Sequence, residues 1–312
     1  MYIQNRFKRK HSTSSVLFKN IIYIFTWGSR IITTRNKVKT ILLYPQYPGR
    51  KAVINKMAKS LGYNITNNPQ KNHQLVVYWQ DSTYREPDSV IQSLTQKELA
   101  VNLRCTNISK SKVDDVFEDV FGYSSIVNPT TFSGLMVKKS EINASYDGVI
   151  VQGPLTPEVG YIYQKVINNE HDKQFVVDMR IPVINGRMIW GYLKYKSISS
   201  RFANFSKNIL SIKEPEVLPI NNLLTAKEME LITSFCQRIG LDYGELDVLR
   251  DNDDKKIYII DVNNTPTGPT VNKKLKKECV KQLANLFEAE FIHSQRSNDT
   301  KIYTWHELKW QT

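Results

Sequence analysis

The sequence is poor in cysteine, has no long apolar run and lacks acidic residues throughout positions 1–80. Its three cysteines lie far apart and form no CxxC motif or Cys/His pair, so neither a disulfide framework nor a zinc site is expected. No segment reaches the roughly 18 apolar residues that a membrane-spanning helix needs. We therefore expect a soluble protein of a reducing cytoplasm, and its 312 residues are enough for two or three lobes.

The net charge of +13 comes mainly from residues 1–80, which contain no Asp or Glu, because the rest of the chain is close to neutral. Residues 1–40 predict a basic arm whose apolar segment, 16–27, can lie on an anionic membrane surface or on a partner. Two other interpretations stay open. The segment can pack on the next domain with its lysines in solvent, or it can be a signal, although Lys19 interrupts the apolar region and no cleavage site follows.

A small α/β domain is predicted to follow the arm. The apolar run 41–43 predicts a strand that Pro45 ends, and residues 50–63 have helical spacing. The segment QLVVYWQD, 74–81, then returns as a strand and completes a β-α-β unit. Further on, residues 113–123 predict a short amphipathic helix.

The next part of the chain reads as strands. Three short apolar segments lie at 133–139, 148–155 and 161–167. Residues 175–195 predict two strands around Asn185-Gly186, a dipeptide favoured in tight type I′ turns.

The first of these two strands has one polar and one apolar face. Alternation puts Asp178 and Arg180 on the polar face. The opposite face carries Phe175, Val177, Met179, Ile181 and Val183. A helix at 225–241 follows, with apolar residues on one side.

A second hairpin brings oxygen-bearing side chains together. The segments YGELDVLRD and KKIYIIDVNN flank a polar turn, and we align Asp251 with Ile257 and Leu249 with Ile259. The same register pairs two further sets of residues, Asp247 with Asp261 and Glu245 with Asn263.

Facing carboxylates repel by about 1 kcal/mol unless a cation lies between them. A magnesium ion suits such carboxylate and amide oxygens. The equally weighted alternative is a sheet rim with solvated acids and an Asx turn before the proline.

The order of these segments resembles the ATP-grasp superfamily, nearest the branch of glutathione synthetase and the amino-acid (glutamate) ligases. The resemblance covers roughly residues 130–290 and depends on the segments DVNNTPTG, GLDYGELDVL, YQKVI and the block 176–206. It implies an α/β (α+β) fold in which two subdomains clasp ATP. It also implies a ligase that activates a carboxylate as an acyl phosphate, which an amine then displaces.

The resemblance suggests the domain boundaries and the ligands. We expect a basic arm at 1–40, an N-terminal α/β domain at 41–125 and an ATP-grasp domain at 126–312. Within the last, 126–168 would hold the phosphate lysine and the linker, and 169–312 the metal ligands. ATP and Mg²⁺ are the implied cofactors. The implied partners are small-molecule or peptide carboxylate and amine substrates, with an anionic surface contact through the arm and no specific nucleic acid.

Individual roles follow from the matched positions. The metal ligands would be Asp247, Asp261 and Asn263. The nucleotide would be held by Lys139 (or Lys138), by the linker residues Gln164, Lys165, Val166 and Ile167, and by Asp178. The catalytic positions would be Arg180, Arg201 and Asn204. Guanidinium suits phosphate or carboxylate because it can bind two oxygens at once. A salt bridge between Asp178 and Arg180 is the competing structural interpretation.

Three positions depart from the usual pattern. Gln164 and Asp261 stand where Glu is more common, and the loop SEINASYDG, 140–148, has only Gly148. These departures keep open a nucleotide-binding protein without ligase turnover, and the basic first 80 residues keep open a protein that binds nucleic acid or a membrane surface. A hydrolase is not expected, because the five histidines take part in no Ser-His-Asp or Cys-His arrangement.

Overall fold

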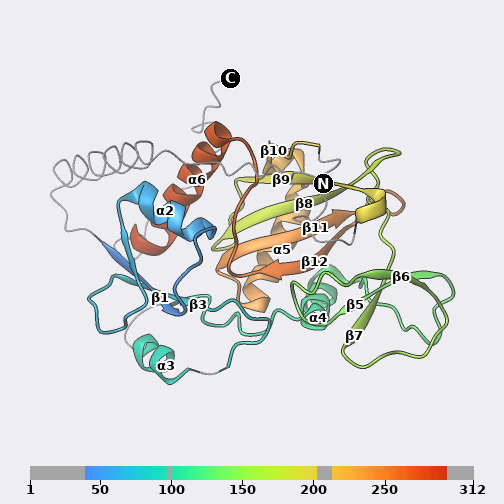
Figure 1. The fold of residues 1–312 in the computed structure, drawn as a ribbon, viewed down its shortest axis with the longest axis horizontal. Helices are drawn as coiled ribbons and strands as arrows, with labels where there is room; N and C mark the ends of the chain where they lie inside the picture. Colours follow the sequence, from blue (N-terminus) through green and yellow to red (C-terminus); the bar gives the residue numbers. More distant parts are fainter. Residues whose placement is uncertain (1–38, 87, 97–99, 202–212, 294–312) are drawn as a thin grey trace, which may run out of the picture.

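The computed structural model describes residues 39–86, 88–96, 100–201 and 213–293 (Figure 1). Nearly all of the predicted basic arm, and Asn204 of the predicted catalytic set, lie outside these ranges. Within them, no helix combines the length and the apolar character needed to cross a membrane.

The N-terminal domain is a parallel four-stranded sheet of order β2-β1-β3-β4. Helices α2 and α6 pack on one face of it and α3 on the other. This arrangement confirms the predicted β-α-β unit. The elements are β1 (Thr40–Pro45), α2 (Val53–Leu61), β2 (Asn64–Thr66), β3 (Leu75–Trp79), α3 (Ser89–Thr95) and β4 (Ala100–Val101).

The three apolar segments that follow form a small antiparallel sheet of order β6-β5-β7. Its strands are β5 (Leu135–Ser140), β6 (Val149–Gln152) and β7 (Tyr161–Lys165).

A five-stranded antiparallel sheet of order β10-β9-β8-β11-β12 forms the largest layer. Its strands are β8 (Phe175–Ile184), β9 (Trp190–Ser197), β10 (Glu216–Pro219), β11 (Tyr243–Arg250) and β12 (Ile257–Asn263). The helices around it are α4 (Lys110–Phe121), α5 (Ala226–Ile239) and α6 (Lys273–Glu288), with 3₁₀ turns Ile198–Ser200 and Ile220–Asn222 and a π turn Ala289–His293.

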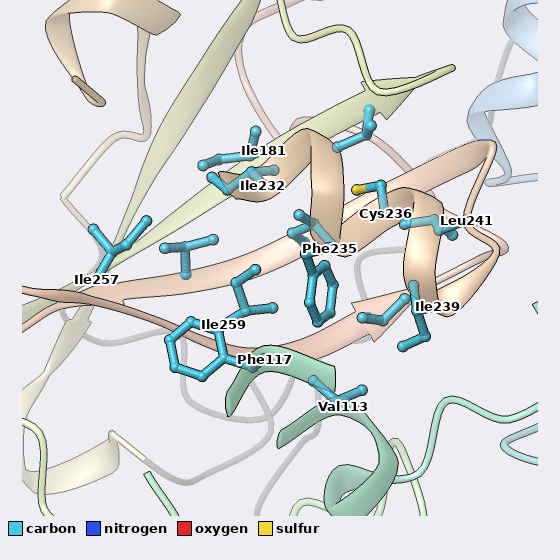
Figure 2. Packing of buried hydrophobic residues seen from close by; sticks show 14 of the residues in the cluster. Val113, Phe117, Ile181, Ile232, Phe235, Cys236, Ile239, Leu241, Ile257 and Ile259 are labelled. Atoms are coloured by element: carbon cyan, nitrogen blue, oxygen red, sulfur yellow. The ribbon is translucent and has the colours of Figure 1, made fainter. Parts of the chain in front are cut away.

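The apolar face of this sheet is covered by α4 and α5 (Figure 2). Phe117 of α4 and Phe235 of α5 pack over Ile181 and Ile259 of the sheet. The predicted apolar face of β8 is confirmed in its second half, where Met179, Ile181 and Val183 enter this core, whereas Phe175 and Val177 are half-buried. Burial of the apolar face leaves the opposite face of β8 for polar chemistry.

Local signals explain where these elements begin and end. Asn185 and Gly186 have φ of 50° and 74°, as a type I′ turn requires. A Cβ at Gly186 would lie 2.8 Å from the Thr233 side chain, so glycine is required there. Helix α5 begins with a capping box between Thr225 and Glu228.

The register of the β11-β12 hairpin matches the prediction at Asp247 and Glu245 and differs from it near the turn. Asp247 faces Asp261 and Glu245 faces Asn263, which confirms the two functional pairs. The expected pairs of Leu249 with Ile259 and of Asp251 with Ile257 are both wrong, because a β-bulge after Asp247 places Val248 opposite Ile259 and Arg250 opposite Ile257. The extra residue is Ile260 on β12, and such a bulge shifts the pairing by one position.

Two contacts cross the predicted domain boundaries, which otherwise stay a prediction. Helix α4 lies before residue 126 but packs on β12 and α5 of the large sheet. Helix α6 lies near the C-terminus but packs on α2 of the N-terminal domain.

Candidate active site

A cavity of about 600 Å³ lies between the small sheet and the polar face of the large sheet. Strands β5 and β7 line one side, and β8, β9, β11 and β12 line the other. The loops 81–83 and 142–148 also contribute to the lining. Figure 1 shows the small sheet beside the β12 edge of the large sheet. The cavity is polar because the apolar face of the large sheet is already covered by helices.

Two facing carboxylates form one wall of the cavity. Asp247 and Asp261 are register partners, and the Oδ1 atom of Asp261 is buried without a hydrogen-bond partner. The pKa of Asp247 is raised to about 7, chiefly by burial; Arg180 opposes the shift, and the neighbouring Asp261 adds to it. A buried carboxylate oxygen without a partner is costly, and a bound cation would satisfy it.

Asn263 adds an amide oxygen to this wall. Its Oδ1 accepts a hydrogen bond from the Thr265 backbone N–H at 2.9 Å, so the Asx turn considered as an alternative is present. An amide oxygen has a second lone pair and can also face a cation. In the described ranges no three His, Cys, Asp or Glu side chains form a metal-binding group. The set that fits Mg²⁺ is therefore two carboxylates and one amide, with water or phosphate oxygens completing the shell.

Arg180 stands directly opposite Asp247 on the neighbouring strand. Its Nε lies 2.7 Å from Asp247 Oδ1, and its Nη1 donates to Glu245 Oε1 at 3.2 Å. Burial opposes the charge of the guanidinium, but Asp247 and Glu245 outweigh this effect, so its pKa is raised. The Tyr192 hydroxyl donates to the same Glu245 oxygen at 3.0 Å. Arg180 therefore stays charged in a fixed position at the metal-ligand wall.

Asp178 and Arg180 do not neutralise each other in the way that the competing interpretation assumed. Asp178 forms an ion pair with Lys196 of β9 and accepts a hydrogen bond from Asn169 at 3.1 Å. Burial would raise the pKa of Asp178, but Lys196, together with Arg180 and Lys194, outweighs this effect and lowers it. Arg201 also reaches this corner of the cavity, where its Nη2 donates to the Ile167 carbonyl at 3.0 Å.

The structure brings Lys139, and not Lys138, into the cavity. The pKa of Lys139 is lowered to about 8, chiefly by burial and also by Lys110, whereas Asp261 and Asp247 partly compensate. Lys138 points to the other face of β5, where it pairs with Glu158 and lies 4.4 Å from the centre of the Tyr161 ring. A buried ammonium that faces two carboxylates is well placed to meet phosphate oxygens.

Three of the four predicted linker residues line the cavity: Gln164, Lys165 and Ile167. The Gln164 side chain is buried and donates to the Ser125 hydroxyl at 2.7 Å. Lys165 lies 3.0 Å from both Asp251 and Asp254. Burial opposes the charge of Lys165, but its hydrogen bonds prevail and raise its pKa. Ile167 lines the cavity, and Val166 is half-buried outside the lining.

Two lysines of the lining, Lys194 and Lys196, and the supporting carboxylate Glu245 were not assigned to the site from the sequence. Lys194 of β9 stands opposite Asp178, and burial, with Arg180 and Lys196 nearby, lowers its pKa to about 8. The alternation of Lys194 and Lys196 along β9 was the available signal. Glu245 was aligned with Asn263, but its contact with Arg180 comes from a different strand and had no local signal.

The glycine-poor loop 141–148 is held over the cavity by hydrogen bonds. The Asn143 backbone N–H donates to Thr83 Oγ1 at 3.0 Å. Lys110 Nζ donates to the Ile142 carbonyl at 2.9 Å. Ala144 and Tyr146 have φ of 61° and 52°, so this loop adopts left-handed conformations without glycine. A glycine-rich loop adopts such conformations freely because glycine has no Cβ. Here, hydrogen bonds to neighbouring elements hold the loop in them.

The geometry agrees with comparisons to solved structures, which show that the chain has the ATP-grasp fold. It is similar to the ATP-grasp ligase PsnB complexed with a phosphomimetic variant of its minimal precursor, Mg and ADP. The TM-score is 0.52 at 9% identity, over 81% of this chain and 99% of that one. It is also similar to D-alanine–D-alanine ligase from Bacillus anthracis (TM-score 0.51, 10% identity, 83% and 98% covered).

A third similar structure is the VanG D-Ala:D-Ser ligase from Enterococcus faecalis (TM-score 0.51, 11% identity, 82% and 100% covered). No family model and no curated protein sequence matches the chain. These structures show the fold that the resemblance implies, and they do not single out the glutathione synthetase branch.

Proposed function

We propose that the protein is an ATP- and Mg²⁺-dependent carboxylate–amine ligase that works through an acyl phosphate. The observation that carries this proposal is the meeting of two sheets at one cavity. Lys139 comes from the small sheet, and Asp247 and Asp261 come from the large sheet, with the Asp261 Oδ1 atom lacking a partner. The similar structures of PsnB with Mg and ADP, and of the Bacillus anthracis ligase with ATP, support the choice of ligands.

Each group has a role that its position supports. Lys139 would bind phosphate oxygens from the small-sheet side, and Ile167 would supply an apolar surface near the base. Asp247, Asp261 and Asn263 would hold magnesium, which offsets negative charge on the phosphates when bound. Arg180, fixed by Glu245, would orient the carboxylate or the transferred phosphoryl group by two parallel hydrogen bonds.

The carboxylate substrate would lie where the N-terminal domain closes the cavity, at the loop 81–83. A carboxylate oxygen held there would attack the terminal phosphorus of ATP, and an amine would then displace phosphate from the acyl phosphate. Asp178, paired with Lys196, and Arg201 would surround the nucleotide phosphates from the β8-β9 side. Both small molecules and peptides remain candidate substrates.

A second candidate function is nucleotide binding without ligase turnover. The hydrogen-bonded loop 141–148 favours it, because a loop held by Thr83 and Lys110 has less freedom than the glycine-rich loop that such ligases use. Mg-ATP binding without any ADP formation, tested over a panel of carboxylates and amines, would favour this candidate.

The test of the proposed site is thermal unfolding with and without Mg-ATP. A ligand that binds only the native state adds about 2.7 kcal/mol to its stability at a hundredfold excess over Kd. Asp261→Ala should abolish this gain while the ligand-free protein stays folded. Asp115→Ala, on the exposed side of α4, is the matched control and should keep it. An equal rise in unfolding temperature in both variants would show that Asp261 does not contribute to Mg-ATP binding.

A further inference from the structure

The exposed side of helix α6 carries a concentration of lysines. The helix buries Cys279, Leu283 and Phe287 against the N-terminal domain, and its other side faces solvent. We call five residues the α6 lysine face: Lys273, Lys274, Lys276, Lys277 and Lys281. Four of them are exposed, and Lys276 is half-buried at the border with α2. Over the same stretch the only acidic residue is Glu278.

This arrangement works against the stability of the helix itself. The first turn of α6 contains no acidic residue, although the N-terminal end of a helix favours negative charge. Lys273, Lys277 and Lys281 follow one another at a spacing of four residues, at which like charges repel. Among the described residues, none of the five side-chain ammonium groups has an ion-pair or hydrogen-bond partner. An anion bound from outside would relieve both effects.

The positive surface continues onto α2. Lys56 Nζ donates to the carbonyls of Lys51 at 2.7 Å and Thr267 at 3.1 Å. The pKa of Lys56 is lowered to about 8, chiefly by burial and also by the nearby Lys276, so the two ammonium groups repel each other. Figure 1 shows α2 and α6 side by side, in agreement with their packing contacts.

The α6 lysine face follows the candidate active site along the chain, and the segment between them contacts the cavity. The loop 264–272 leads directly from Asn263 at the end of β12 to the start of α6. Its Thr265 hydroxyl lies 3.2 Å from Asp81 Oδ1 at the cavity, and its Pro266 carbonyl accepts from Val53 of α2 at 2.9 Å. A chain-like ligand bound on α6 can therefore continue toward the cavity.

We propose that the α6 lysine face binds an acidic polypeptide, which presents one of its carboxylates to the cavity. This rests on the proposed ligase function, because the polypeptide would supply the carboxylate that is activated. The chemistry favours carboxylates over nucleic acid. The face has no arginine, which could bind a phosphate through two parallel hydrogen bonds. The only aromatic residue of α6, Phe287, is buried and cannot stack on a base.

The test is fluorescence anisotropy of a labelled oligoglutamate of about 20 residues with the full chain, at several salt concentrations. The patch variant combines Lys273→Gln, Lys274→Gln, Lys277→Gln and Lys281→Gln. It should weaken binding at least about tenfold and flatten the dependence on salt, because fewer counterions are displaced. Since these lysines repel one another, the variant should unfold at no lower temperature than the parent chain.

The control variant removes the same charge from exposed positions elsewhere: Lys71→Gln, Lys173→Gln, Lys227→Gln and Lys255→Gln. It should retain most of the affinity for oligoglutamate. Equal losses in both variants would show attraction by net charge alone and overturn the proposal. Patch-dependent binding of single-stranded DNA or of phosphatidylserine vesicles, without binding of oligoglutamate, would overturn it in favour of those partners.

The rise in unfolding temperature on addition of Mg-ATP tests the ligase proposal separately from the α6 lysine face. The patch variant should show the same gain as the parent chain, because none of its four lysines lines the cavity. Loss of oligoglutamate binding with an intact Mg-ATP gain supports the α6 lysine face. If the parent chain bound oligoglutamate but showed no Mg-ATP gain, the surface would stand and the ligase proposal would fail.

Discussion

Arg180 Nε lies 2.7 Å from Oδ1 of Asp247, its register partner on β11. The guanidinium therefore acts as the counter-ion of a carboxylate that is also a candidate metal ligand. Its other end is fixed by Glu245, whose second oxygen, Oε2, is buried without a partner. One planar group thus connects a structural carboxylate with a functional one, and a lysine has no fork with which to reach both.

Replacing Arg180 by lysine should separate binding from turnover. We expect Arg180→Lys to lower kcat, measured with a verified substrate pair, by about a hundredfold while Kd for Mg-ATP changes by about threefold or less. The reason is that orientation of the reacting groups is lost, whereas most of the positive charge remains. Arg187→Lys, at an ion pair with Glu290 away from the cavity, is the control. A large loss of affinity with unchanged kcat would make Arg180 a simple nucleotide ligand.

The affinity for Mg-ATP should depend on pH with a maximum between about 7 and 8. Asp247, with a pKa raised to about 7, must be ionised to hold a metal, so affinity falls as pH drops below 7. Lys139, with a pKa lowered to about 8, must be protonated to attract phosphate, so affinity falls as pH rises above 8. Isothermal titration calorimetry across pH 6 to 10 measures both limbs.

Arginine in place of Lys139 should remove the alkaline limb of this profile, because guanidinium stays charged at every pH in that range. Lys194 has a similarly lowered pKa, so Lys194→Arg is needed as a parallel variant. An alkaline limb that survives Lys139→Arg but disappears with Lys194→Arg would transfer the phosphate contact to β9.

Loosening the loop 141–148 should speed nucleotide exchange. Thr83→Val keeps the shape of the side chain but removes the oxygen that accepts from the Asn143 backbone N–H. A lost hydrogen bond of about 1 kcal/mol corresponds to roughly fivefold more frequent opening. Association and dissociation rates of a fluorescent ATP analogue, measured by stopped flow, should both rise by about this factor, with little change in Kd.

The control is Thr95→Val, which removes a hydroxyl hydrogen bond within α3, outside the cavity lining. It should leave both rates unchanged. If Thr83→Val also left them unchanged, the loop would not limit access to the cavity, and the left-handed residues Ala144 and Tyr146 would only shape it.

Much of the fold follows from signals that are local in the sequence. Asn185-Gly186 specifies its hairpin because both residues tolerate positive φ, and Gly240 closes α5 at φ of 77°. The polar turn between β11 and β12 is also a local signal, although the register next to it differs from the prediction by one position and the bulge restores the predicted pair of Asp247 with Asp261. Signals of this kind need only a few neighbouring residues.

The remaining features depend on contacts between distant segments. Alternation along β5 gives Lys138 and Lys139 opposite faces but does not say which face meets the large sheet. The bulge at Ile260 and the contact between Arg180 and Glu245, 65 residues apart, arise from how β11 packs between β8 and β12. Packing of α6 on α2 likewise needs the whole chain.

The reaction products provide the last and most direct prediction. With Lys139, Asp247 and Asp261 around the phosphates, the terminal phosphoryl group should transfer, so ADP and phosphate should form and AMP should not. An acyl phosphate makes a further demand. Oxygen-18 in the substrate carboxylate must appear in the released phosphate, because that oxygen bonds to phosphorus and leaves with it when the amine attacks carbon. Mass spectrometry of the phosphate measures this transfer. AMP among the products, or phosphate without the label, would exclude the acyl-phosphate route and leave the ATP-grasp fold unaffected.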